Sequence, residues 1–180
     1  GAGIMLSLQD TSLVGNVGTP SVSLLYEQTT VNNQMSTGFQ NAGTLAASGV
    51  KVFAGHALIG KNVDHFELFM EKTGSPTGTF DFRVIQYGNT SGGTIYTPDK
   101  TDFSTISTSG EWISCASGSH TIVANDVLTA WSTNASGDAS NKISVMGVAP
   151  LTISNIYWTE MNAGWAQVSN YQTGIKIYGT

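Results

Sequence analysis

The chain has 180 residues, of which 11% are charged, and its net charge at pH 7 is −5. Soluble proteins carry about 25% charged residues, and the 7 basic residues here are scattered, so the clustered positive charge of a nucleic-acid binder is absent. No apolar run approaches the roughly 18 residues that cross a bilayer, so neither nucleic acid nor a membrane span is expected.

Residues 1–28 are predicted to form a separate N-terminal arm. The first strand pattern of the arm alternates apolar and other side chains, with the apolar ones at Ile4, Leu6 and Leu8. A stretch rich in Gly, Asn and Pro follows, and then a second predicted strand over Val22–Glu27. The start, GAGIMLSLQ, has no basic n-region, so we expect a mature form, an excised domain or a virion component made in the cell.

Residues 29–49 are small and polar and are predicted to be a connecting segment, since a loop of this length suggests a linking role. Residues 50–180 are predicted to form a sandwich of short strands separated by turn signals. The expected strands are Val50–Ile59, Val63–Glu71, Thr79–Tyr87, Glu111–Cys115, His120–Val123, Val127–Ser132, Lys142–Val148, Ile153–Thr159 and Gly174–Tyr178. With no helical segment between them, they predict an all-β, antiparallel, jelly-roll-like sandwich.

The stretch from His56 to Tyr87 gives the clearest pattern. Two amphipathic strands flank a turn that contains Gly74, Pro76 and Gly78, a combination that excludes a helix. Alternation gives each strand an apolar face, formed by Phe66, Leu68 and Met70 and by Phe80, Phe82 and Val84. On the outer faces, we expect Glu67 or Glu71 to pair with Arg83.

The blocks LIGKNVDHFELFMEKTGSPTGTFDFRVI, SGSHTIVANDVLTAWS, NKISVM and GWAQVSNYQTGIKIYG resemble a β-sandwich module of secreted archaeal and bacterial surface proteins and some viral structural proteins. In that family the first block is a strand pair around a K-x-G-x-P-T-G-T turn, here Lys72–Thr79. A strand with a tryptophan, here Trp165, and a short last strand, here Ile175–Tyr178, close the module. The resemblance covers about residues 50–180. It implies a fold and carries no catalytic residues.

Catalytic chemistry is not expected. The single Cys115 cannot form an internal disulfide; we expect a small buried hydrophobe, because the alternative, a catalytic thiol, has no base nearby in the sequence. His56, His65 and His120 fall on separate strands or strand edges, without the spacing of a zinc or hydrolase motif.

Carbohydrate binding is the alternative function. The segment YWTEMNAGW offers a candidate sugar platform in which aromatic faces stack on a sugar and polar groups fix its hydroxyls, although tryptophans in sandwiches usually pack in the core. The platform residues are Trp158, Glu160, Asn162 and Trp165. A remote alternative is a jelly-roll glycoside hydrolase with two glutamates across a cleft. Its candidate residues are Glu67, Glu71, Glu111 and Glu160.

No cofactor is expected, with calcium as a weak alternative. Two polar loops offer oxygen ligands, although ordinary turn chemistry also explains them. Their residues are Asn134, Asp138 and Asn141 in one loop and Asp99 and Asp102 in the other. Asn89 and Asn134 also begin glycosylation acceptor patterns, which indicates exposed loops.

The sequence therefore favours a non-enzymatic structural subunit of an extracellular, cell-surface or virion assembly, such as a filament, surface layer or capsid. Copies would associate as a homo-oligomer or polymer through sheet edges, with the arm acting as a donor strand. Its pocket-filling side chains would be Ile4, Leu6 and Leu8. The alternative is that the arm pairs within its own chain.

Overall fold

The computed structural model describes residues 21–34, 39, 45–149, 155–162, 164–168 and 171–180. Strands are the main element of this part of the chain, with turns and loops between them and a short 3-10 turn, η2 (Phe103–Thr105). Within these ranges, no helix has the length and apolar character needed to cross a membrane.

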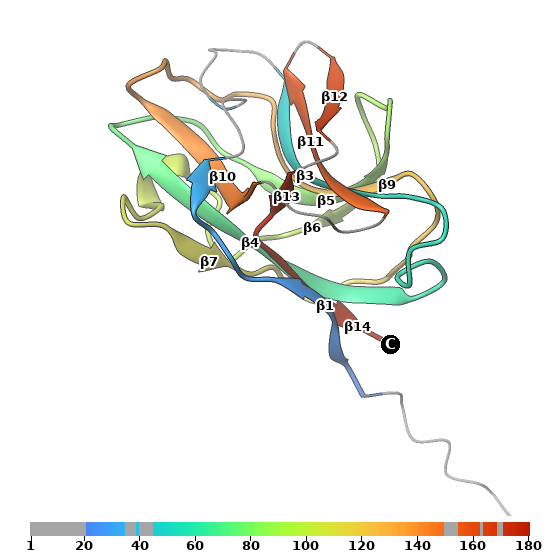
Figure 1. Cartoon of the computed structure of the whole chain (residues 1–180). Helices are drawn as coiled ribbons and strands as arrows, with labels where there is room; N and C mark the ends of the chain where they lie inside the picture. Colours follow the sequence, from blue (N-terminus) through green and yellow to red (C-terminus); the bar gives the residue numbers. More distant parts are fainter. Residues whose placement is uncertain (1–20, 35–38, 40–44, 150–154, 163, 169–170) are drawn as a thin grey trace, which may run out of the picture.

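The strands form two antiparallel sheets that pack as two layers (Figure 1). The eight-stranded sheet runs β1 (Ser23–Gln28), β14 (Ile175–Gly179), β4 (Asn62–Thr73), β10 (Lys142–Val148) and β13 (Gln172–Thr173); β2 (Asn33–Gln34) pairs with β10, and β7 (Glu111–Ile113) and β8 (His120–Thr121) pair with β4. The six-stranded sheet runs β12 (Trp165–Val168), β11 (Ile156–Asn162), β3 (Ala46–Val52), β9 (Asp126–Ser132), β5 (Asp81–Gln86) and β6 (Thr94–Tyr96). The predicted all-β sandwich is confirmed, and its jelly-roll connectivity stays a prediction.

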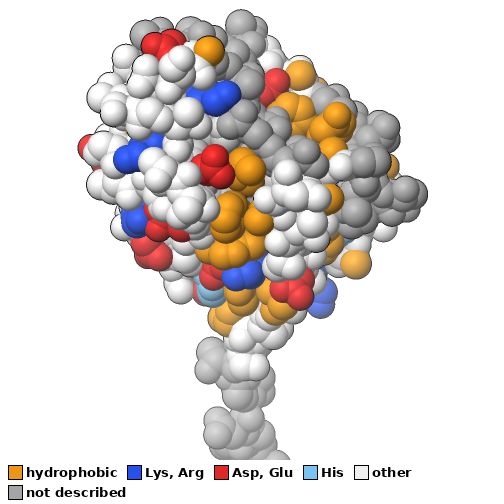
Figure 2. All heavy atoms as spheres, turned by 60° about the vertical axis from the view of Figure 1, so that its left-hand side comes forward, with side chains coloured by type: hydrophobic (Ala, Val, Ile, Leu, Met, Phe, Trp, Pro, Cys, Tyr) orange, Lys and Arg blue, Asp and Glu red, His pale blue; other side chains and the backbone are white. Residues whose placement is uncertain are grey.

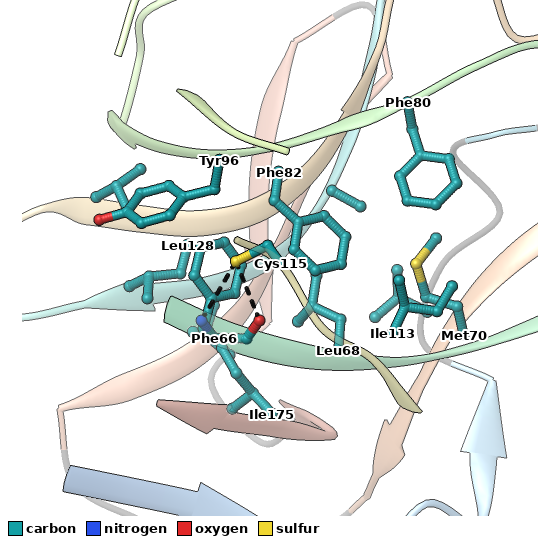
Figure 3. Close-up of a cluster of buried hydrophobic side chains, with 14 of the residues drawn as sticks. Phe66, Leu68, Met70, Phe80, Phe82, Tyr96, Ile113, Cys115, Leu128 and Ile175 are labelled. Atoms are coloured by element: carbon teal, nitrogen blue, oxygen red, sulfur yellow. Dashed lines mark hydrogen bonds between the residues drawn. The ribbon is translucent and has the colours of Figure 1, made fainter. Parts of the chain in front are cut away.

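The core lies between the sheets and follows the two-residue alternation of β4 and β5. Phe66, Leu68 and Met70 are fully buried on β4, and Phe82 and Val84 are fully buried on β5. The rings of Phe66 and Phe82 stack across the gap with their centroids 5.1 Å apart. Figure 3 shows Phe80 and Phe82 entering this cluster from one sheet and Leu68 and Met70 from the other.

The expected pairing of Glu67 or Glu71 with Arg83 is wrong, because β4 and β5 lie in different sheets. Glu67 instead accepts a hydrogen bond from Lys176 on the neighbouring β14, at 2.8 Å. Arg83 pairs with Asp81 on its own strand. Alternation fixed which face each side chain occupies, but it did not identify the neighbouring strand.

The turn between β4 and β5 depends on two glycines. Gly74 and Gly78 adopt φ of +64° and +122°, which side chains rarely allow. A Cβ on Gly74 would also lie 2.2 Å from the carbonyl oxygen of Ser140. The turn is fastened to the loop before β10 by the bridge between Thr77 and Ser136. This contact holds two turns together at one end of the sandwich.

Several predicted boundaries differ from the structure. The strand expected over Val50–Ile59 ends at Val52, and turns follow, with positive φ at Gly55 and Gly60. β6 was not predicted, because its three residues are too few to show a pattern. The sandwich also draws on all three predicted segments: β1 lies within residues 1–28, and Phe39, in the predicted connection, is fully buried in the core.

The contact between Phe66 and Phe82 predicts a large loss on truncation. We expect Phe66→Ala to lower the free energy of unfolding by about 3–5 kcal/mol, because it removes a buried ring and leaves a cavity between the sheets. Ile95→Ala, at a side chain that is 58% exposed, should cost under about 0.5 kcal/mol. Denaturant unfolding followed by fluorescence measures both. A loss under about 1 kcal/mol for Phe66→Ala would contradict the assigned core.

Candidate functional site

β1 forms an open border of the eight-stranded sheet. It pairs with β14 from Ser23 opposite Gly179 to Gln28 opposite Ile175, and no other described strand pairs with it. The N–H and C=O groups on the outer side of such an edge strand can pair with an added strand. β1 is the longest of the strands at the borders of the two sheets.

The side chains of β1 divide between the core and solvent. Leu25 and Tyr26 pack against the main hydrophobic cluster, which ties the strand to the sandwich. Leu24 is 46% exposed, and Val22 just before the strand is 48% exposed. Glu27 is the only charged residue of the strand, although a register shift between Leu24 and Tyr26 interrupts its ladder. Natural edges are usually protected by charges, Pro or β-bulges; β1 has one charge and the register shift, and it has no Lys or Pro.

An aromatic belt crosses the outer face of the same sheet and reaches this edge. The registers place its members on one face, because directly opposed residues of neighbouring strands share a face. They are Leu24 on β1, Tyr178 and Lys176 on β14, His65, Glu67 and Phe69 on β4, and Trp112 on β7. The side chains other than Leu24 are partly buried.

Ring–ring and cation–π contacts join the side chains of the belt. The ring of His65 stacks on Tyr178 with centroids 4.5 Å apart, and Phe69 meets the edge of Trp112 at 5.3 Å. The Lys176 ammonium lies 4.3 Å from the centre of the Trp112 ring. Figure 2, which turns the left side of Figure 1 forward, shows a hydrophobic stripe bordered by charged side chains on this side of the molecule. Apolar stripes of this kind commonly contact other proteins.

The predicted donor-strand residues Ile4, Leu6 and Leu8 lie outside the described residues. The chain enters β1 at the end of the molecule where its C-terminus also lies (Figure 1).

The structure does not bring the two tryptophans of the predicted sugar platform onto one surface. Trp165 lies directly opposite Met161 in the hairpin of β11 and β12, so it shares the face of Met161. Trp158 comes three residues before Met161 and therefore projects from the other face. Glu160 shares the face of Trp158, and nothing is described for the side chain of Asn162.

Both indoles are held by packing and hydrogen bonds. Trp158 is 7% exposed, and its Nε1 donates to Ser48 Oγ at 3.1 Å. Trp165 Nε1 donates to the carbonyl oxygen of Asn89 at 2.7 Å, and its ring leans on Tyr87 at 5.4 Å. These contacts give each tryptophan a structural role.

The candidate glycosidase residues Glu111 and Glu160 lie in different sheets. Burial raises the pKa of Glu160, in the direction that suits a general acid. For Glu111, burial acts to raise the pKa, but hydrogen bonds from Lys100 and the Ser107 N–H outweigh it and lower the pKa. Glu111 is thus one half of an ion pair.

His65 and His120 lie on the paired strands β4 and β8, whereas His56 lies in the turns after β3, where a strand was expected. His56 meets the edge of Tyr26 at 5.4 Å, and burial lowers its pKa. His120 Nε2 is 2.8 Å from Asp126 Oδ2, while its Nδ1 is 2.9 Å from Thr94 Oγ1. This chain of three groups links β8 of one sheet to β6 and β9 of the other. No spacing in the sequence predicts this link, because the three groups come from separate strands.

The Asp126 carboxylate anchors that link. It is 1% exposed, and its Oδ2 also accepts from the Val123 N–H at 2.8 Å, while Gln86 Nε2 donates to Oδ1. The buried carboxylate therefore has hydrogen-bond partners on both of its oxygens, as buried polar groups usually do.

Cys115 is a buried hydrophobe, as predicted. Its side chain lies in the core, where Sγ accepts from the Phe66 N–H at 3.4 Å and donates to the Phe66 carbonyl at 3.3 Å (Figure 3). Burial raises the pKa of the thiol to about 12. A thiol in this state is a poor nucleophile.

The loops named for calcium use their oxygens within the protein. Asp138 accepts from the N–H groups of Ser140 and Asn141, which lowers its pKa, and Asp102 accepts from the Ser104 N–H at the start of η2. Asn134 Oδ1 accepts from the Thr79 N–H at 2.9 Å. Within the described ranges, no group of three or more His, Cys, Asp or Glu is placed to hold a metal.

Comparisons of the chain with protein-family models, with curated proteins and with solved structures found no match. The resemblance to a surface-protein module therefore stays a prediction.

The burial of Cys115 predicts a slow thiol. In the native protein at mildly alkaline pH, we expect an aromatic disulfide reagent to react at least about a hundredfold more slowly than with a free cysteine, because the thiolate is scarce and enclosed. Adding denaturant should restore the ordinary rate. A native rate equal to that of a free cysteine would contradict the described core.

The raised pKa of Glu160 predicts that the stability of the fold depends on pH. Its pKa in the fold is raised from the ordinary 4.5, so the unfolded chain loses the proton first, and stability falls as pH rises through this range. Glu160→Gln should remove that loss. The variant should exceed the wild type in free energy of unfolding at neutral pH and match it well below pH 4.5. Glu27→Gln, at an exposed side chain, is the control. Parallel curves for wild type and Glu160→Gln would refute the assignment.

Proposed function

We propose that the protein is a non-enzymatic structural subunit of an extracellular or virion assembly, and that copies join through the open edge of β1. The observation that supports this is the edge itself. Its six residues pair with a single described neighbour and include one charge. Leu24 on the strand and Val22 just before it are about half exposed. An edge with these properties accepts an added strand.

Strand addition supplies both affinity and specificity. Backbone hydrogen bonds along β1 extend the sheet over about 20 Å, since a strand rises about 3.3 Å per residue. Side chains of the added strand that point to the outer face would meet the aromatic belt, beginning at Leu24 and Tyr178. Burying apolar surface there adds to the ladder's contribution.

The added strand in this proposal comes from the N-terminal arm of a second copy. Its alternating side chains at Ile4, Leu6 and Leu8 suit a half-buried strand. Because the donor segment around Ile4–Leu8 and the acceptor strand β1 are different surfaces, the contact is heterologous, and it continues from copy to copy into a filament or closes into a shell. Two β1 strands pairing with each other would instead stop at a dimer.

Light scattering during size-exclusion chromatography tests the proposal. The intact chain should elute as a large species that grows with concentration, and a chain of residues 21–180 should be monomeric with an unchanged circular dichroism spectrum. The deletion stops before β1, because Leu25 and Tyr26 belong to the core packing. An intact chain that stays monomeric at high concentration would sink the proposal.

A matched pair of substitutions locates the contact. Leu24→Lys places a charge at the β1 edge, where we expect it to reduce the large species at least tenfold at fixed concentration. Val123→Lys makes the same change at a residue that is 49% exposed, against 46% for Leu24, and it should leave assembly unchanged. Equal effects of the two variants would place the contact elsewhere.

A further inference from the structure

A cavity of about 320 Å³ opens where β5 begins and β9 ends, on the six-stranded sheet. Its position differs from both the β1 edge and the predicted sugar platform. The lining combines one aromatic side chain, Trp131, with an ion pair and several hydroxyl groups. The members used below are Phe80, Asp81, Arg83, Thr101, Trp131 and Thr133.

The strand register builds this cavity. Asp81 on β5 lies directly opposite Trp131 on β9, so the two side chains share the outer face of the sheet. Arg83 follows two residues after Asp81 and therefore projects from the same face. The carbonyl of Thr101 accepts from the Phe80 N–H at 2.9 Å, which holds the segment before η2 against the start of β5.

The ion pair is a fixed set of hydrogen-bonding groups. Arg83 Nε and Nη2 donate to the two carboxylate oxygens of Asp81 at 2.7 and 2.8 Å, and Nη1 reaches the Gly92 carbonyl at 3.4 Å. A guanidinium has five N–H groups, so others remain for a ligand. The carboxylate oxygens likewise keep lone pairs. Because the pairing is bidentate, these groups are held in a defined orientation.

Trp131 carries an unmet hydrogen bond beside the cavity. Its side chain is 1% exposed, and the Arg83 guanidinium lies 4.8 Å from the centre of the indole ring. The indole Nε1 is buried and has no acceptor among the described residues. Buried donors without a partner are rare in native proteins.

We propose that this cavity binds a small neutral polyhydroxylated ligand, a single sugar ring. Its volume lies at the lower end of the range for small-molecule sites, about 300–1,000 Å³, which fits one ring. Ligand hydroxyls would donate to Asp81 and accept from Arg83, with Thr101 and Thr133 at the rim. The indole of Trp131 would supply the apolar wall.

The charge balance excludes other ligand classes. A phosphate or carboxylate would need net positive charge, but the Arg83 charge is already paired with Asp81. A cation would need a carboxylate without a partner, but the Asp81 carboxylate is paired with Arg83. An apolar ligand would leave the ion pair without its solvent hydrogen bonds, which is costly. A neutral ligand with many hydroxyls satisfies the groups present.

Nuclear magnetic resonance of the indole N–H groups tests the proposal. The chain has 4 tryptophans, and their crosspeaks can be assigned by single Trp→Phe variants. Glucose, galactose, mannose and N-acetylglucosamine are titrated separately, with inorganic phosphate as the charged comparison. At least one sugar should shift the Trp131 crosspeak to saturation, while the Trp112 crosspeak, from the other sheet, should stay in place.

Two variants assign the effect to the cavity. Thr133→Phe fills the cavity from an exposed position, and Arg83→Lys keeps the charge but loses the bidentate fork. Each should weaken sugar binding at least tenfold. Thr97→Phe, at an exposed threonine outside the lining, should have no effect. The proposal is overturned if no sugar shifts Trp131, if the shifts persist in Thr133→Phe, or if phosphate binds more tightly than every sugar.

Discussion

The stacking of Phe66 on Phe82 is the contact on which the rest of the structure depends. These rings come from strands that are neighbours in the chain but belong to opposite sheets, and their centroids are 5.1 Å apart. Once they face each other, the alternation of β4 and β5 sends every second side chain outward. The aromatic belt on one sheet and the Asp81–Arg83 pair on the other are both products of that arrangement.

The outer faces and borders of the sandwich hold the features that suit contact with other molecules. One sheet ends in β1, an edge with little charge and an aromatic belt beside it. The other sheet carries the cavity next to Trp131. Meanwhile the groups with intrinsic reactivity have structural partners: Cys115 bonds with the Phe66 backbone, and His120 with Asp126. This distribution supports the proposal of a binding and assembly role.

The alternation of residues predicted which face of a strand each side chain occupies, but it did not predict which strands are neighbours in a sheet. The burial of Phe66, Leu68 and Met70 followed from their spacing, because a period of two is local information. The partner of Arg83 did not, since neighbouring strands in a sheet are chosen by the whole fold.

The same limit applies to the candidate binding sites: the face of a residue could be predicted, but its neighbours on the next strand could not. The sugar platform failed as one surface because the hairpin register, which places Trp165 opposite Met161, depends on the turn that joins the strands. Asp81 and Arg83 were expected on an outer face, but Trp131 joins them only through the pairing of β5 with β9. The arm residues remain predictions from their alternation alone. Electron microscopy of the purified intact chain tests the account most directly: ordered filaments or shells in which each copy adds a strand to β1 of the next are the predicted result, and dispersed single molecules, or an assembly that leaves β1 uncovered, would contradict it.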